Sequence, residues 1–427
     1  MIGAVMFVLL IGLMFIGVPI AFSMGLSAVI MLLINATATP VAITTRAVNS
    51  LDSFTTMAIP FFMMASFILT GSNVGVKIFR FASTAVRHLR GGLAHVNVLT
   101  SMIMAGMSGS AVSDVSGIGR MEIEAMEEAG YDTDFSAAVT AASSTIAPII
   151  PPSTSCVLYG SITGVSIGAL LIGGLVPGIL MGLLQMIICW FTAKKRGYPL
   201  QPKASRRETW LAFKDGFAAM MMPVILVVGI LSGYFTPTEG ACVATVYSIF
   251  IGMFVYKTLT FKKLFKILMD TSVFAGATLF VLSMASIFGL VLTHNQIPTV
   301  LTNFFLGLSD NKFVLLFLIN ILLLILGMLM EGNAIYMIMG PILGMMAVQL
   351  GCDPVHFGIM VIFNLTLGLI TPPVGLCLFL TQKVAKITTS QMIKSIMPFV
   401  IMMIICLLII TYFPPLVTWL PSLFNLC

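Results

Sequence analysis

Continuously apolar runs of about 20 residues constrain this chain more than any other feature of its sequence. A helix rises about 1.5 Å per residue, so about 20 apolar residues cross the roughly 30 Å hydrocarbon core of a bilayer. Because the apolar residues are contiguous rather than alternating, the runs predict membrane helices and argue against a transmembrane β-barrel. Runs that could cross lie at about 2–17, 19–35, 54–71, 134–160, 165–193, 218–235, 239–256, 271–293, 354–381 and 396–418.

The composition excludes a soluble protein. Hydrophobic residues make up 59% of the 427 residues, and charged residues only 8%. An average soluble domain is roughly one quarter charged, so a soluble globule of this composition could not cover its surface. We therefore predict an all-α polytopic membrane protein surrounded by the lipid bilayer, with no nucleic-acid partner. The chain has no GxxxxGK[ST] phosphate-binding loop, so we expect that it does not itself hydrolyse ATP.

Two further apolar stretches are too long for one crossing and carry polar residues in their middles. The first, about 92–120, is interrupted near Ser108–Ser110, and the second, 311–350, near Glu331–Asn333. We interpret each stretch as a re-entrant hairpin, the first extending to residue 130. Irregular backbone at membrane depth is tolerated only where protein covers it or where it lines a cavity.

The basic residues predict the orientation. If the ten crossings alternate and each hairpin returns to its own side, 19 of the 21 Lys and Arg residues fall on one face. Only Arg46 and Lys312 fall on the other. Basic loops stay in the cytoplasm, so we predict that both termini lie outside it.

The sequence also contains a weak internal repeat. Residues 145–152 (TIAPIIPP) align with 366–373 (TLGLITPP), Gly106-Met107 with Gly327-Met328, and Cys156 with Cys377. In the predicted topology the two copies are inverted relative to each other. Inverted repeats with discontinuous helices are typical of secondary transporters, whose site lies near the membrane midplane.

Two segments of the first copy could carry chemistry. Residues 106–119 place hydroxyls, glycines and Asp114 inside an apolar stretch, which favours a cation-binding hairpin tip over a small-residue packing face. Residues 143–155 contain Pro148, Pro151 and Pro152, which must break the crossing 134–160. The break frees carbonyl groups for Na⁺ and creates a helix N-terminus for an anion. A proline kink that neighbouring helices satisfy is the alternative.

Two segments of the second copy match them. Glu331 and Asn333 interrupt the second hairpin, and an acidic residue inside the membrane indicates a functional site by default. A purely structural Glu331 is the alternative. Residues 366–375 break the crossing 354–381, as 143–155 break the first.

Taken in order, these motifs resemble a known family. They are GSAVSD at 109–114, PPST at 151–154, TPTE at 236–239, ME at 330–331 and TPPVG at 371–375. The ordered set resembles the large membrane subunit of tripartite ATP-independent periplasmic (TRAP) transporters, of the wider ion-transporter group, over essentially the whole chain. The resemblance implies a Na⁺-driven elevator transporter in the bacterial inner membrane, with a static scaffold and a mobile domain built from both hairpins and both broken helices.

The resemblance also implies partners and a substrate class. A periplasmic binding protein delivers an organic acid, of the sialic acid or C4-dicarboxylate type, and a small membrane subunit completes the complex. The small subunit is expected here as a separate polypeptide. The oligomeric state and the number of coupled Na⁺ ions stay open.

The site residues follow motif by motif. The Na⁺ ligands implied by the resemblance are Ser108, Gly109, Ser110, Pro148, Pro151 and Ser153 for one site and Gly332, Asn333, Thr371, Val374 and Gly375 for the other. The substrate residues implied are Asp114, Ser153, Thr154, Glu331 and Asn333. No arginine is evident for a substrate carboxylate, and Arg120 is a weak candidate.

The expected domains alternate between scaffold and transport elements. The scaffold comprises residues 1–71 and 218–293, the transport elements comprise 72–193 and 294–390, a cytoplasmic linker with an interfacial helix covers 194–217, and a C-terminal helix lies within 391–427. A stand-alone dicarboxylate transporter, and less plausibly an ion channel, are the alternatives. An enzyme is not expected, because no nucleophile–base pair or metal set is present.

Overall fold

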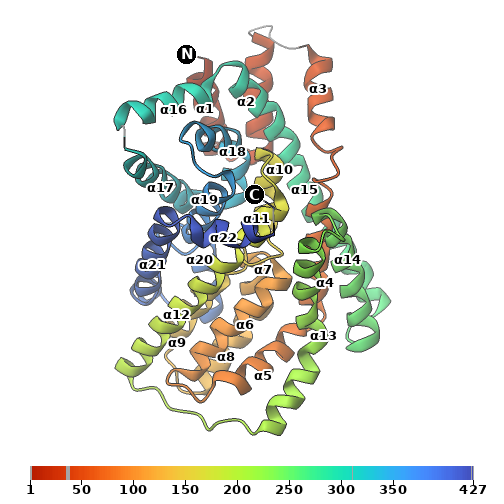
Figure 1. The fold of residues 1–427 in the computed structure, drawn as a ribbon, viewed down its shortest axis with the longest axis vertical. Helices are drawn as coiled ribbons and strands as arrows, with labels where there is room; N and C mark the ends of the chain where they lie inside the picture. Colours follow the sequence, from red (N-terminus) through yellow and green to blue (C-terminus); the bar gives the residue numbers. More distant parts are fainter. Residues whose placement is uncertain (1, 35–38, 310, 425, 427) are drawn as a thin grey trace.

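The computed structural model describes residues 2–34, 39–309, 311–424 and 426, and these residues form helices and no strands (Figure 1). The ends of the predicted run 19–35 and of the segment 391–427 fall partly outside them. The first half contains α1 (Ile2–Phe15), α2 (Ile20–Ile34), α3 (Pro40–Asn49), α4 (Ala58–Gly71), α5 (Val74–Val86), α6 (Gly92–Ser108), α7 (Ala111–Asp114), a π-helical turn (Val115–Gly119), α8 (Arg120–Glu128), α9 (Thr133–Ser144), α10 (Thr154–Thr163), α11 (Ile167–Gly173) and α12 (Leu175–Arg196). The second half contains α13 (Arg206–Leu231), α14 (Pro237–Phe250), a π-helical turn (Ile251–Val255), α15 (Phe261–His294), α16 (Ile297–Leu308), α17 (Lys312–Leu329), α18 (Gly332–Gln349), α19 (Pro354–Gly368), α20 (Leu376–Ala385), α21 (Thr389–Tyr412) and α22 (Pro415–Leu423).

The helices have membrane-spanning dimensions. Among the described residues, seven helices are long and apolar enough to cross a bilayer, and two bent helix pairs meet the same criterion together. The all-α polytopic architecture predicted from the apolar runs is therefore confirmed.

Each predicted hairpin is a pair of helices joined at the polar interruption. In the first, α6 and the helical arm 111–128 are bent by 120° at Gly109, which has a φ of +58°. In the second, α17 ends at Leu329 and α18 begins at Gly332. Both arms of the first hairpin pack against α9, and both arms of the second pack against α19. We call Ser108–Ser110 the first tip and Met330–Asn333 the second tip.

Each predicted broken crossing consists of two short helices. Helix α9 ends at Ser144 and α10 begins at Thr154, whereas α19 ends at Gly368 and α20 begins at Leu376. Proline lacks an N–H and clashes with the carbonyl one turn earlier, so neither helix can continue through its prolines. Both breaks contain a cis Pro-Pro bond, at 151–152 and at 372–373, again 221 residues apart. We call residues 145–153 the first break and 369–375 the second break.

The second helix of each broken crossing packs against the other half of the chain. Helix α10 contacts α18 and α19, both from the second half, and α20 contacts α7, α8 and α9 from the first half. The hairpins and broken helices of the two halves therefore form one interlocked body.

Buried polar pairs repeat within this body. In the first half, the Ser143 hydroxyl donates to the Asn97 side-chain oxygen at 2.7 Å. In the second half, the Asn364 amide donates to the Asn320 side-chain oxygen at 2.8 Å. Ser143 and Asn364 are 221 residues apart, so equivalent positions join a hairpin arm to the broken helix in both halves.

The remaining long helices pack around this body. Helix α2 contacts α15, α4 contacts both α14 and α15, and α13 contacts α5 and α14. Hydroxyl groups join these helices: Thr245 donates to the Phe61 carbonyl at 2.8 Å, and Ser283 donates to the Ala47 carbonyl at 3.0 Å. On α5, Arg87 forms a two-pronged ion pair with Glu208 of α13, at 2.8 and 3.1 Å.

Three segments differ from the sequence-based expectation. The predicted interfacial helix 204–216 is not separate, because α13 runs unbroken from Arg206 to Leu231 and even contains Pro223. The segment 72–91, expected as a cytoplasmic connection, contains α5, bent by 71° from α4. The segment after residue 293 forms α16. In each case polar or basic residues on one face of a helix hid the helix in the sequence.

The basic end of the molecule lies opposite α3. The connection 197–205 from α12 to α13 runs along the bottom in Figure 1, and α3 lies at the top. Arg196, at the end of α12, pairs there with Asp132 at 2.8 Å and Asp134 at 2.9 Å. Arg46 of α3 thus lies at the end opposite Arg196, as predicted from the segregation of charge. Which end faces the cytoplasm stays a prediction.

Candidate functional site

Both hairpin tips and both broken crossings meet around one small cavity, which we call the inner cavity. Its volume is about 40 Å³. The residues that line it are Ser110, Ala111, Val112, Pro148, Thr154, Ser155, Glu331, Gly332, Asn333, Tyr336, Leu365, Thr366 and Leu369. Segments more than 200 residues apart in the sequence therefore share a single site, where the two halves cross.

The first tip lies directly on the first break. The Gly109 carbonyl accepts hydrogen bonds from the Thr154 hydroxyl at 2.9 Å and from the Thr154 N–H at 3.4 Å. A Cβ atom on Gly109 would lie 2.4 Å from the Pro152 carbonyl oxygen. Only glycine combines the left-handed backbone with this close approach, so the GS dipeptide of the first tip has a steric cause.

Ser153 caps the helix that starts after the first break. Its hydroxyl accepts a hydrogen bond from the Cys156 N–H at 3.1 Å and donates one to the Pro148 carbonyl. Ser153 is fully buried and does not line the inner cavity, whereas the next two residues, Thr154 and Ser155, do. The first turn of α10 therefore faces the cavity, and Ser153 positions that turn.

The second tip contributes an acid and an amide. The Asn333 amide donates to the Glu331 carboxylate at 2.7 Å, and both side chains line the inner cavity. Tyr336 lies one turn further along α18 and lines it too. The first turn of α18 thus meets the first turn of α10 at the same cavity.

The second break is only partly in contact with this cavity. Val374 and Gly375 line a neighbouring side cavity of about 260 Å³, and Glu331 and Leu369 line both cavities. The Thr371 hydroxyl donates to the Leu367 carbonyl at 2.7 Å. Thr371 lines neither cavity.

Buried oxygen atoms near the first tip are left without partners. The Ser108 hydroxyl and one carboxylate oxygen of Asp114 are buried and have no hydrogen-bond partner among the described residues. Asp114 lies a turn behind the first tip and does not line the inner cavity. Arg120 is exposed and pairs with Glu124 at 2.7 Å, so its guanidinium is engaged away from the cavity.

The chemistry of these atoms fits a hard cation. An alkali-metal ion takes oxygen ligands, and the first tip and first break supply the unpartnered Ser108 hydroxyl together with carbonyl groups of irregular backbone. Among the described residues, no group of three or more His, Cys, Asp or Glu side chains could hold a transition metal. The predicted Na⁺ ligands of the first set are thus brought together, whereas those of the second set are divided between two cavities.

Sequence reasoning missed several residues that line the cavity. Ser155, Tyr336 and Thr366 all line it, but none was singled out. Ser155 follows Thr154 in the same first turn, and Tyr336 is three residues after Asn333. Helical spacing places residues three apart on one face, so the periodicity after each break was the available signal.

Comparison with known proteins agrees with this geometry. The family model described as "Tripartite ATP-independent periplasmic transporter, DctM component" matches residues 7–416. The chain belongs to this family. It is therefore a transport protein of the membrane and not an enzyme. The predicted resemblance is confirmed over nearly the whole length.

Two relatives and one solved structure are similar to this chain. The sialic acid TRAP transporter large permease protein SiaM of Vibrio cholerae is 39% identical over 97% of each chain. The C4-dicarboxylate TRAP transporter large permease protein DctM of the same species is 38% identical over 98% of this chain and 97% of that one. The crystal structure of the YdaH transporter of Alcanivorax borkumensis shares the fold, with a TM-score of 0.62 at 14% identity, over 90% of this chain and 89% of that one.

Proposed function

We propose that this chain is the large membrane subunit of a Na⁺-driven importer of an organic acid, working by an elevator movement. The observation that carries the proposal is the inner cavity, which both tips and both broken crossings enclose. A site at the crossing of two inverted repeats is where secondary transporters bind their substrates. Membership of the TRAP transporter family supports the same function.

The electrostatics of the inner cavity suit a carboxylate. The first turns of α10 and α18 both face it, and helix N-termini carry partial positive charge with free N–H groups. Hydroxyl groups of Ser110, Thr154 and Ser155 can donate to the same anion. No Lys or Arg is among the lining residues, so backbone dipoles and hydroxyl groups would hold the substrate.

Sodium ions would offset the acidic residues nearby. Glu331 is the one acidic residue lining the inner cavity, and Asp114 is buried behind the first tip. A carboxylate close to an anionic substrate is repulsive unless a cation lies between them. The first set of residues, around Ser108 and the first break, would hold one Na⁺, and the second set, around Gly332 and the second break, would hold another. Binding of the ion and of the acid would then be coupled by charge.

The size of the inner cavity indicates that it must open. At about 40 Å³ it is far smaller than the roughly 300–1,000 Å³ of pockets that enclose small organic ligands. The tips would have to separate to admit the substrate. In the proposed elevator, the body made of both hairpins and both broken helices, α6–α10 and α17–α20, then slides against α2, α4, α14 and α15.

The substrate class and the partners follow from the family. Two relatives are named for sialic acid and C4-dicarboxylate transport, and both kinds of substrate carry a carboxylate. We propose that this chain transports an acid of that class across the bacterial inner membrane. A soluble periplasmic protein would deliver the acid, and a small membrane subunit would pair with the scaffold.

Reconstitution tests the proposal. Proteoliposomes containing this chain and its small subunit should accumulate N-acetylneuraminate or succinate when the cognate binding protein and an inward Na⁺ gradient are present. Equal uptake with K⁺ in place of Na⁺ would refute the Na⁺ coupling. Full uptake without any binding protein would instead favour a stand-alone transporter, and single-channel currents would favour a channel.

A further inference from the structure

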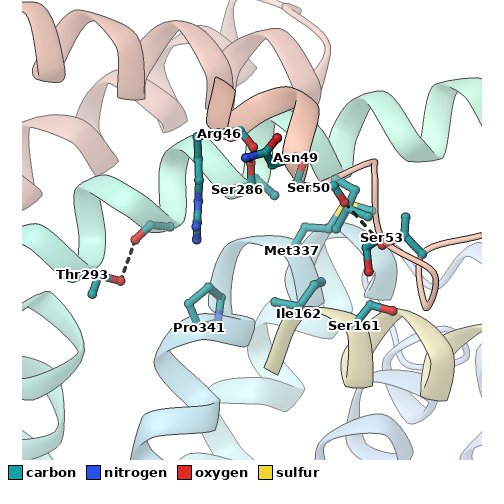
Figure 2. A pocket seen from close by; sticks show the side chains of 14 residues that line it. Arg46, Asn49, Ser50, Ser53, Ser161, Ile162, Ser286, Thr293, Met337 and Pro341 are labelled. Atoms are coloured by element: carbon teal, nitrogen blue, oxygen red, sulfur yellow. Dashed lines mark hydrogen bonds between the residues drawn. The ribbon is translucent and has the colours of Figure 1, made fainter. Parts of the chain in front are cut away.

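A second, larger pocket lies between the peripheral helices and the interlocked body, and we call it the outer pocket. Its volume is about 410 Å³. One wall comes from α3, the connection after it and α15, and the other wall comes from α10 and α18 (Figure 2). It therefore spans the boundary across which the proposed elevator would move.

Arg46 dominates the chemistry of this outer pocket. Figure 2 shows its side chain extending from the last turn of α3 into the hollow, toward Pro341. It is the one charged residue among those lining the pocket. Among the described residues, its guanidinium forms no ion pair and no hydrogen bond. Neutral polar side chains surround it: Asn49, Ser50, Ser53, Ser161, Ser286 and Thr293.

An unpaired arginine is notable at this end of the molecule. Arg46 and Lys312 are the two basic residues predicted for the outer face. The Lys312 ammonium donates to the Gly351 carbonyl at 2.7 Å, so it is already engaged. Arg46 is thus the outer-face cation left free for a ligand. A guanidinium offers paired N–H groups that match the two oxygens of a carboxylate.

The outer pocket adjoins the inner cavity. On α10, Ser155 lines the inner cavity and Ser161 lines the outer pocket, a separation of about 9 Å along the helix. On α18, Tyr336 lines the inner cavity and the next residue, Met337, lines the outer pocket. The same two helices therefore carry both sites.

We propose that the outer pocket is a first binding site for the organic acid, in which Arg46 holds the carboxylate before the acid enters the inner cavity. The proposal rests on the proposed function and adds to it the cationic group that the inner cavity lacks. The two sites differ in the way that this order requires. The outer pocket is large enough for a small organic anion and has a free cation, whereas the inner cavity is closed and relies on dipoles. Movement of α10 and α18 past α3 would separate Arg46 from the acid, so that the strong cation does not retain it.

Substitution of Arg46 tests the proposal in proteoliposomes with saturating binding protein. The acid used is N-acetylneuraminate or succinate, whichever the unaltered complex takes up. We expect Arg46→Gln to lower the maximal uptake rate about tenfold and Arg46→Lys, which keeps the charge but not the paired N–H groups, to lower it about threefold. Lys312→Gln is the matched control, since it removes the other outer-face cation, and its uptake rate should stay within twofold of the unaltered complex.

Binding of the delivery protein separates the competing explanation. The affinity of the loaded binding protein for the membrane complex in nanodiscs, measured by biolayer interferometry, should be the same for Arg46→Gln and the unaltered chain. A parallel loss of this affinity would show that Arg46 docks an acidic side chain of the binding protein, and would overturn the proposal. Unaltered uptake by Arg46→Gln would overturn it as well. If the unaltered complex takes up no acid, the proposed function itself fails, which is a distinguishable result.

Discussion

In the first half of the chain the hairpin tip lies directly on the break, whereas in the second half the equivalent elements leave space between them. Ser108, Gly109 and residues 145–153 are all buried, and Gly109 is bonded to Thr154. In the second half, Glu331, Pro373 and Val374 are exposed, and the side cavity lies between the second tip and the second break. The repeat therefore conserves the breaks and the interruptions, but not their closure.

A single residue accounts for part of this difference. Gly109 has a φ of +58°, and the residue 221 positions later, Met330, has a φ of −134°. In the second half the left-handed glycine lies in the break instead, at Gly375, with a φ of +44°. The tip that carries the left-handed glycine can approach its break, and the other tip cannot. The second tip is thus the one free to move when the inner cavity opens.

The largest effect is expected from closing off this approach. Gly109→Ala forces a left-handed alanine, at a cost of about 1–3 kcal/mol, and drives its Cβ into the Pro152 carbonyl at 2.4 Å. Uptake should fall at least tenfold, since small misplacements of a site are costly. Gly375→Ala should cost less, because its Cβ would be 3.1 Å from the nearest atom. Uptake and melting temperature in detergent measure both, and equal losses would contradict the asymmetry described here.

The buried polar pairs should respond alike in the two halves. Asn97→Leu and Asn320→Leu each leave buried partners unsatisfied, Ser143 in one case and Asn364 in the other. Each should lower the free energy of unfolding by about 1–3 kcal/mol. Differential scanning fluorimetry on the purified complex is the measurement. If one variant were destabilised and the other were not, the two halves would not share this pair as an equivalent structural element.

Sodium dependence should distinguish hydroxyl groups at the two tips and breaks. Ser108→Ala and Ser110→Ala should raise the Na⁺ concentration for half-maximal uptake roughly five- to tenfold, equivalent to about 1 kcal/mol. Thr371→Ala should raise it less, because its hydroxyl is already bonded to the Leu367 carbonyl. Ser108→Ala should leave the melting temperature unchanged, since no described partner is lost. An unchanged Na⁺ dependence in all three variants would refute the proposed ion sites.

The smallest effect concerns the bond between the first tip and α10. Thr154→Val removes the 2.9 Å hydrogen bond to the Gly109 carbonyl but retains the N–H contact. We expect a loss of about 0.5–1.5 kcal/mol in the free energy of unfolding. Thr154→Ser is the control, because it keeps the hydroxyl and should melt as the unaltered chain does. A stability equal to the control in Thr154→Val would indicate that packing alone holds the first tip.

Much of the fold could be predicted from sequence because membrane helices have a strong one-dimensional signal. Three prolines at 148, 151 and 152 had to break a helix. The amphipathic helices were harder: α5 carries Lys77 and Arg80 among apolar residues, and it was taken for a connection. Helix α13 was divided in two because its first turns are charged, although no breaker lies at the boundary.

The candidate site was less predictable, for a physical reason. Short motifs marked Thr154, Glu331 and Asn333, which the structure brings to one cavity. Ser155 and Tyr336 join them only because of the rotation of α10 and α18 about their axes, which no motif encodes. Arg46 served the sequence argument solely as a marker of orientation. Its pocket is formed by residues more than 100 positions away, so no local pattern could have revealed it.

The exchange of α10 and α20 between the halves has a consequence for biosynthesis. A ribosome completes α10 long before α18 and α19 emerge, so the partners of α10 do not yet exist when it reaches the membrane. The first break must wait, with its irregular backbone uncovered, until the second half is inserted beside it. The two halves can then close only together, and neither ion site exists in a nascent chain that stops before residue 368.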